Sequence, residues 1–249
     1  MKIMLKGSLW LLVMALTVAF VGATDANADT IKVTYGVYKT GSGGEFTFSD
    51  YNTPPISQQA PIVRTAKDTF QSFCIEKNED LTNGTTYDYL VSTKAQLGGI
   101  GGGSPDPLSA ETAYLFHHFW YGTLGSYDYL DLTNDGDATT IGDGRDGSAR
   151  ELQKAIWALE DELTTAAPTG GQALKWYNEA VAAVASGAWN GLGQVRVLNL
   201  YTEGFSGINS KPYVHQSQLV VVPLPGAAAL GLGLLGMLGL AGAIRRKRS

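Results

Sequence analysis

The stretch Ser148-Ala149-Arg150-Glu151-Leu152-Gln153-Lys154-Ala155-Ile156-Trp157 carries the clearest local structure in the chain. Ser148 and Glu151 have the spacing of a capping box, in which the serine oxygen accepts an early backbone N–H and the glutamate reaches back to the serine N–H. The apolar residues that follow at helical spacing are Leu152, Ala155, Ile156, Leu159 and Leu163. The pattern predicts an amphipathic helix that begins near Ser148 and holds Gln153 in its first turn.

Extended runs flank this helix on both sides. Short runs bounded by Gly, Pro, Ser and Asn predict strands over 30–38, 45–48, 69–75, 194–201 and 217–222. Helical patterns cover 108–121, which is dense in aromatic residues, and 172–186. The glycine-rich run 98–103 lacks the Lys-Ser/Thr ending of a phosphate-binding loop and is interpreted as a linker. The expected fold class is α+β, a β-barrel or sandwich with a helical insertion that presents Gln153.

The two ends of the chain differ from its middle. Lys2 and Lys6, an apolar run over 9–21 and a small-residue site at 26–28 are typical of a cleaved secretory signal. An uncharged run over 226–244 precedes the basic residues Arg245, Arg246, Lys247 and Arg248. As a helix this run would be about 28 Å long, enough to cross a hydrocarbon core, with the basic tail in the cytoplasm. We expect a signal peptide over 1–28, one domain over 29–222 and a membrane segment over 223–249.

The charge of the middle part limits its partners. Residues 29–222 contain 12 basic and 22 acidic side chains, a net charge of −10. That sign argues against a nucleic acid partner and against binding to an acidic membrane surface. It suits a solvated module outside the cell.

Cys74 is the one cysteine of the chain. In a secreted protein an unpaired thiol is inert in a core, in contact with another chain, or reactive. Gln153 offers a further possibility, because attack of the thiol on the carboxamide with loss of ammonia gives an internal thioester. Such a bond stores an acyl group that an outside nucleophile can take.

These residues resemble the bacterial thioester domains of surface adhesins. The cysteine of that family follows an aromatic residue, as Cys74 follows Phe73. Its glutamine lies in a Thr-Gln-x-Ala-Ile-Trp motif, and residues 152–157 of this chain are Leu-Gln-Lys-Ala-Ile-Trp. Leu152 stands where the family has threonine. The resemblance implies a thioester between Cys74 and Gln153 and covalent capture of an amine on a partner surface. Storage requires exclusion of water, and the expected surroundings include Phe73, His118, Trp120 and Trp157, with Phe119 and Tyr121 as further candidates.

The C-terminal segment resembles the PEP-CTERM sorting signal, which exosortase-type transpeptidases process. A proline motif formed by Val222, Pro223, Leu224 and Pro225 precedes the apolar run and the arginine cluster. Leu224 stands where the glutamate that gives the motif its name would be, so the motif resembles a Val-Pro-Leu-Pro variant. The alternative is a plain C-terminal membrane anchor, and both place the domain outside the cell.

Two other site chemistries fit the sequence less well. The aspartates over 131–147 invite a calcium site, but the spacing lacks a glycine at the sixth loop position and a glutamate at the twelfth, so a solvated loop is expected. A cysteine peptidase would pair Cys74 with His117, His118 or His215, but Glu76, Glu79 and Asp80 would raise the pKa of the thiol. No metal, cofactor or enzymatic turnover is predicted.

The sequence therefore predicts a secreted, surface-sorted adhesin-like protein. Its expected partners are an amine-bearing target, such as a protein lysine or an amino sugar, an exosortase-type enzyme, and the membrane through its C-terminal helix. The alternative is a noncovalent matrix or polysaccharide-binding module in which Cys74 is buried and inert.

Overall fold

A computed structural model describes residues 29–41, 43–50, 69–130, 144–208 and 211–222 of the protein. All of these residues fall within the predicted central domain. The predicted signal peptide, most of the aspartate-rich loop and the C-terminal segment 223–249 lie outside them. Among the described residues, every helix is too short or too polar to cross a bilayer.

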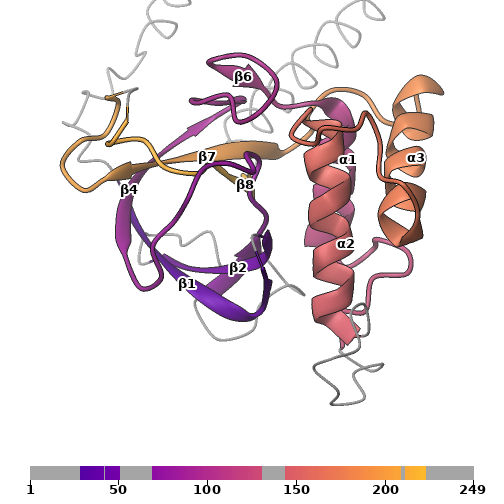
Figure 1. Ribbon diagram of the computed structural model, residues 1–249, viewed down its shortest axis with the longest axis horizontal. Coiled ribbons are helices and arrows are strands. Elements are labelled where there is room, and N and C mark those ends of the chain that lie inside the picture. Colours follow the sequence, from indigo (N-terminus) through magenta and orange to yellow (C-terminus); the bar gives the residue numbers. More distant parts are fainter. Residues whose placement is uncertain (1–28, 42, 51–68, 131–143, 209–210, 223–249) are drawn as a thin grey trace, which may run out of the picture.

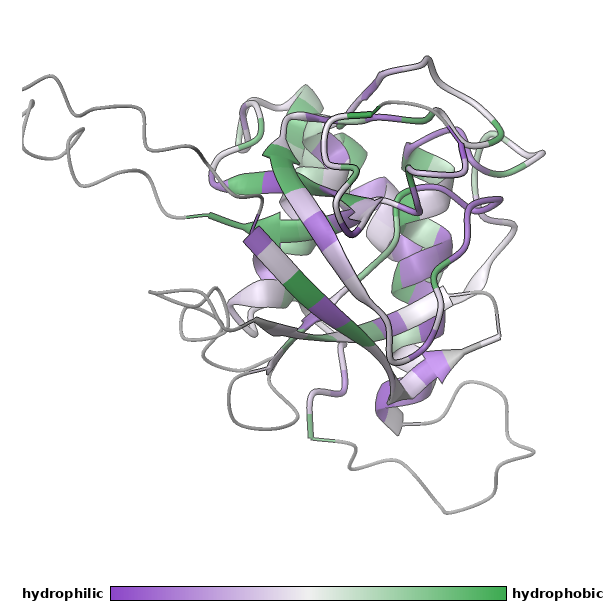
Figure 2. Ribbon diagram, turned by 90° about the vertical axis from the view of Figure 1, so that its left-hand side faces the viewer, coloured by the Kyte–Doolittle hydropathy of each residue, from purple (hydrophilic) through white to green (hydrophobic). Residues whose placement is uncertain are grey.

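Six strands form one antiparallel sheet with the order β3-β2-β1-β4-β7-β8 (Figure 1). They are β1 (Asp29–Thr40), β2 (Gly43–Asp50), β3 (Thr69–Ser72), β4 (Thr86–Ser92), β7 (Val195–Thr202) and β8 (Gln218–Val221). A second, two-stranded sheet pairs β5 (Lys94–Ala95) with β6 (Asp106–Pro107). Hydrophobic and hydrophilic residues mix along the strands, as expected where one sheet face covers a core (Figure 2).

The main sheet curls until its two edge strands meet. Just beyond β3, Cys74 forms an isolated antiparallel bridge with Gln218 of β8. The backbone N–H of Leu219 donates to the Phe73 oxygen at 3.0 Å, and that of Ile75 donates to the Ser217 oxygen at 3.1 Å. Of the expected β-barrel or sandwich, the structure shows the barrel-like form, because one curled main sheet takes the place of two stacked sheets. Cys74 lies where this sheet closes.

Three helices lie between β6 and β7 in the sequence and pack beside the sheet (Figure 1). They are α1 (Ala110–Trp120), α2 (Gly144–Leu159) and α3 (Gly171–Ala185). The side chain of Ser109 caps α1 by accepting from the Thr112 N–H. The predicted helical insertion is thus confirmed, and α2 contacts β1 and β2 directly.

The predicted start of the glutamine helix is wrong. α2 begins at Gly144 rather than at Ser148, so Gln153 lies in the middle of the helix. The Ser148 hydroxyl does not cap the helix but accepts a hydrogen bond from the Asp128 N–H at 3.1 Å. Gln153 therefore lies well beyond the first turn of α2. The helix dipole cannot stabilise an oxyanion there, because the effect of the dipole falls off within the first turn.

A buried ion pair explains the earlier start. Arg145, in the first turn of α2, donates from Nε and Nη2 to the two carboxylate oxygens of Glu45 on β2, both at 2.8 Å. The hydroxyl of Tyr127 donates to the same carboxylate. The Arg145 guanidinium also lies 4.6 Å from the centre of the Tyr38 ring. This fork-to-fork pair fixes the first turn of α2 on the sheet.

Candidate functional site

Cys74 and Gln153 are in direct contact inside the protein. The Cys74 thiol donates to the Gln153 side-chain oxygen at 3.2 Å, and the Gln153 amide nitrogen donates to the Cys74 backbone oxygen at 2.8 Å. Cys74 is 0% exposed and Gln153 is 1% exposed. The thiol is thus held at the carbonyl end of the carboxamide, while the nitrogen that would leave is bound by a backbone carbonyl.

The elements that carry the two residues explain why they meet. Cys74 is fixed by the bridge that closes the sheet, and Gln153 projects from the face of α2 that packs on the sheet. Leu152, Ala155 and Ile156, which surround Gln153 on the helix, are fully buried. A glutamine among them must find its hydrogen-bond partners inside the protein, and Cys74 supplies both.

The backbone of Gly43 closes one side of the pair. A methyl group placed on Gly43 would stand 2.5 Å from Cγ and 3.1 Å from Cδ of Gln153, and 2.9 Å from the Trp157 ring. The separations of 2.5 and 2.9 Å are shorter than real contacts of a Cβ atom, so alanine would require the neighbouring side chains to shift. Gly43 opens β2, two residues before Glu45. The ion pair at the start of α2 therefore lies next to the strand that covers Gln153.

The surroundings of Cys74 keep its thiol protonated. Burial raises the pKa of the Cys74 thiol well above its ordinary value, and negative charge on Glu76 is the second cause. Burial also raises the pKa of the Glu76 carboxyl to about 8, and one of its oxygens has no hydrogen-bond partner among the described residues. A stored thiolate, as cysteine peptidases use, is therefore not favoured in this site.

Trp157 lies one helical turn beyond Gln153 and is 7% exposed. Its indole N–H is buried and makes no hydrogen bond of ordinary geometry with the described residues. It nevertheless lies close enough to the Cys74 sulfur to lower the pKa of the thiol as a donor, against the larger effect of burial. Trp157 thus covers the pair, and its indole N–H donates to no other group among the described residues.

The other predicted surroundings separate into two groups. Phe73 is fully buried beside Cys74, with its ring 4.9 Å from that of Phe119. Trp120 is also fully buried, but its ring contacts are with Phe70 and Phe116 in the core. Phe73 and Trp157 therefore lie with the pair, whereas the contacts of Trp120 lie deeper in the core.

The histidines lie away from the pair. His118 contacts Thr123, with 2.8 Å between Nδ1 and the hydroxyl oxygen, and its ring contacts Tyr114. The ring of His117 contacts Trp189, and His215 is bound to Thr202. Burial lowers the pKa of all three imidazoles. The contacts described for these histidines include neither Cys74 nor Gln153.

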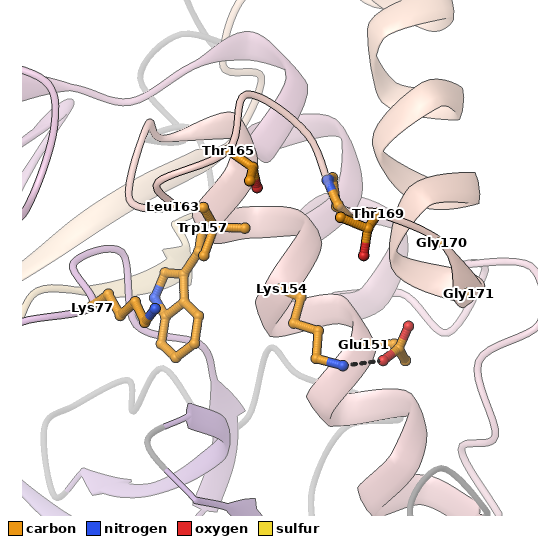
Figure 3. Close-up of a pocket in the computed structure, with 10 residues that line it drawn as sticks. Lys77, Glu151, Lys154, Trp157, Leu163, Thr165, Thr169, Gly170 and Gly171 are labelled. Atoms are coloured by element: carbon orange, nitrogen blue, oxygen red, sulfur yellow. Dashed lines mark hydrogen bonds and ion pairs between the residues drawn. The ribbon is translucent and has the colours of Figure 1, made fainter.

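A pocket of about 590 Å³ lies on the outer side of Trp157 (Figure 3). One wall is the face of α2 formed by Glu151, Lys154 and Trp157, and the opposite wall is the loop that leads to α3. Lys77 extends across the Trp157 ring, with its Nζ 5.7 Å from the ring centre. The residues that line the pocket are Lys77, Glu151, Lys154, Trp157, Leu163, Thr165, Pro168, Thr169, Gly170 and Gly171.

The glycine-rich run 98–103 is more structured than a linker. The carboxylate of Glu162 accepts from the backbone N–H groups of Ile100 and Gly101 at 2.8 and 3.3 Å, and from that of Lys77 at 2.8 Å. Glu162 therefore joins this loop to the segment that follows Cys74. No group of three metal-ligating side chains occurs in the part of the chain that the structure describes, which includes Asp146 from the aspartate-rich loop.

Sequence reasoning missed Gly43, Arg145, Glu45 and Lys77 as parts of the site. A glycine in a strand marks a close approach of another group, but which group it meets depends on the three-dimensional fold. Arg145 and Glu45 are 100 positions apart. Lys77, three residues beyond Cys74, is the basic residue nearest to Cys74 in the sequence, and this proximity was the available signal.

Comparisons with known proteins give little beyond the fold. No family model and no curated protein matches the chain. Among solved structures, the N-terminal thioester domain of a surface protein from Clostridium perfringens is similar with a TM-score of 0.41 and 8% sequence identity. The match covers 77% of this chain and 97% of that one. The interpretation of the site depends on its own contacts.

Proposed function

We propose that the protein is an adhesin-like surface protein that forms an internal thioester between Cys74 and Gln153 and uses it to capture an amine covalently. The observation that carries this proposal is the reciprocal contact of the thiol and the carboxamide, at 3.2 and 2.8 Å, in a site closed to solvent. A buried inert thiol needs no carboxamide beside it, and a buried glutamine needs no thiol.

The first step joins the two side chains. The Cys74 sulfur attacks Cδ of Gln153, the C–N bond breaks, and the thiol proton leaves with the nitrogen as ammonia. The backbone carbonyl of Cys74 already binds the departing nitrogen, which orients the carboxamide for attack. Burial excludes water, which would otherwise hydrolyse the thioester.

The second step transfers the acyl group. An amine attacks the Gln153 carbonyl carbon, the C–S bond breaks, and one amine proton passes to the sulfur. The products are an amide between Gln153 and the target and a free Cys74 thiol. The protein acts once in this scheme, as a covalent tether rather than an enzyme. A bond of this kind holds under shear where a small noncovalent interface would release.

The location proposed for this chemistry is the cell exterior. The secretory pattern at 1–28 and the motif and apolar run over 222–248 support export, sorting by an exosortase-type enzyme, and at least transient membrane attachment. The net charge of −10 over residues 29–222 is consistent with a solvated exterior domain.

Intact mass of the purified domain, residues 29–222, tests the proposal. The expected mass is lower than that of the sequence by one ammonia, and methylamine should add at Gln153 and free the Cys74 thiol. Cys74→Ser and Gln153→Ala should both show the full mass and no labelling. Gln172→Ala, at the start of α3, is the matched glutamine control and should behave as the wild type.

Two results would contradict the proposal. One is the full mass in the wild type with no methylamine incorporation, which would favour a noncovalent matrix or polysaccharide-binding module. The other is methylamine incorporation that persists in Cys74→Ser.

A further inference from the structure

We propose that the pocket beside Trp157 binds an anionic group of the amine acceptor, so that the preferred target is a lysine next to an acidic residue in a peptide segment. The proposal rests on the proposed function, because the pocket gains this role only if Gln153 carries a thioester. It concerns which amines are captured, and Lys77 is the residue that selects them.

The position of the pocket makes it the approach to the buried pair. Trp157 forms part of the pocket wall and also lies beside the Cys74 thiol. The backbone of Gly43 closes a further side of Gln153 and also lies against the Trp157 ring. An incoming amine would therefore reach the Gln153 carbonyl past Trp157, whose place in the pocket wall is seen in Figure 3.

The charge of the pocket is positive although that of the domain is negative. Lys77 and Lys154 line it together with one acidic residue, Glu151. The Glu151 carboxylate is already occupied, since it accepts from Lys154 at 2.6 Å and from the Ala173 N–H at 3.0 Å. Among the described residues, no carboxylate forms an ion pair with Lys77. Lys77 is thus the available cation at the mouth of the pocket.

Lys77 and Lys154 also lie where the residue next to the reacting lysine of a target peptide would be. Lys154 follows Gln153 directly, and Lys77 lies three residues beyond Cys74 with its ammonium over the Trp157 ring. The side chains of Trp157, Leu163 and Pro168 give the pocket an apolar wall. A flexible alkylamine fits past this wall, and a carboxylate on the same segment can remain outside beside Lys77.

The test compares two peptides that differ by one charge, N-acetyl-Gly-Lys-Glu-amide and N-acetyl-Gly-Lys-Gln-amide. In the wild-type domain at low salt, the glutamate peptide should be incorporated at Gln153 about three to five times faster, the range expected for one partly exposed ion pair. Lys77→Gln should bring the ratio close to one, and it should slow the glutamate peptide more than methylamine. The exposed Lys175 lies outside the pocket, and Lys175→Gln is the matched control that should keep the preference.

Equal rates for the two peptides in the wild type would overturn the inference, as would a preference that survives in Lys77→Gln. Faster incorporation of an acidic disaccharide containing glucosamine than of either peptide would overturn the assignment to a peptide target. Failure of methylamine to label any variant is a different result, because it contradicts the thioester itself. Lys77 is exposed, so its substitution should not disturb folding, and an unchanged urea midpoint checks this.

Discussion

The backbone of Gly43 lies directly against the side chain of Gln153, with no room for a methyl group between them. This contact limits the room available to the carboxamide beside the thiol, and Gly43 also lies against the Trp157 ring. The geometry of the pair therefore depends on a residue with no side chain of its own.

Replacement of Gly43 by alanine should displace the carboxamide. We expect Gly43→Ala to lower the fraction of protein with the mass deficit of one ammonia, and to reduce stability by about 1–3 kcal/mol through overpacking. Intact mass and urea denaturation measure the two effects. Gly125→Ala is the control, because a methyl group there meets nothing within 4 Å, and both properties should stay near those of the wild type.

The ion pair of Arg145 and Glu45 should be essential for stability. Both side chains are almost completely buried, so Arg145→Met leaves an unpaired carboxylate and should cost about 3–5 kcal/mol. The exposed pair of Lys154 and Glu151 is the comparison, and Lys154→Met should change stability by less than about 1 kcal/mol. Equal losses in the two variants would contradict the role assigned to the buried pair. Urea midpoints decide between these outcomes.

Replacement of Trp157 by phenylalanine should separate the effect of the indole N–H from that of the aromatic ring that covers the pair. Trp157→Phe keeps an aromatic ring over the pair but removes an N–H that has no other partner, so thioester formation after refolding should slow while the fold is retained. Trp176→Phe is the matched control, because its N–H donates to the Gly125 oxygen at 2.9 Å. That variant should lose stability and form the thioester at the wild-type rate once folded. Equal rates in Trp157→Phe and the wild type would remove the donor role.

The stability of the domain should fall as the pH rises from about 4.5 to about 8. Burial raises the pKa of Glu76 from 4.5 to about 8, so the folded protein keeps a proton that the unfolded chain loses over this window. Glu160, with a pKa raised by burial to about 7, acts in the same direction. Glu76→Gln should flatten the dependence, measured as urea midpoints at pH 5 and pH 8, whereas Glu203→Gln at an exposed position should keep it. An unchanged slope in Glu76→Gln would show that another group titrates.

Much of the fold could be predicted from local pattern. The runs at 30–38 and 45–48 fall within β1 and β2, and the run at 194–201 matches β7 within one residue at each end. The predicted helix 172–186 matches α3 equally closely. Short strands with polar residues were harder, and β4, in which Asp88 is buried, was missed. Its place between β1 and β7 comes from pairing with distant residues rather than from its own sequence.

The site was harder to predict than the fold. The capping-box pattern at Ser148 was outcompeted by the contact of Arg145 with Glu45, which continues the helix back to Gly144. Capping is worth about 1 kcal/mol, whereas a buried, bidentate ion pair in place has a much larger effect when broken. The contact of Cys74 with Gln153, by contrast, was expected from the two short motifs. The nearly complete burial of both residues, and the Gly43 backbone that lies against Gln153, could be known only from the three-dimensional structure.

The bridge between Cys74 and Gln218 determines when the thiol meets the carboxamide during folding. Residues 74, 153 and 218 come from three distant parts of the sequence, and the thiol reaches its position only when the last strand docks on the segment after β3. Before the sheet closes, the chain carries an ordinary thiol and an ordinary amide. Under the proposed function the thioester can therefore form only after the sheet is complete, so an unfolded chain would not acylate its surroundings.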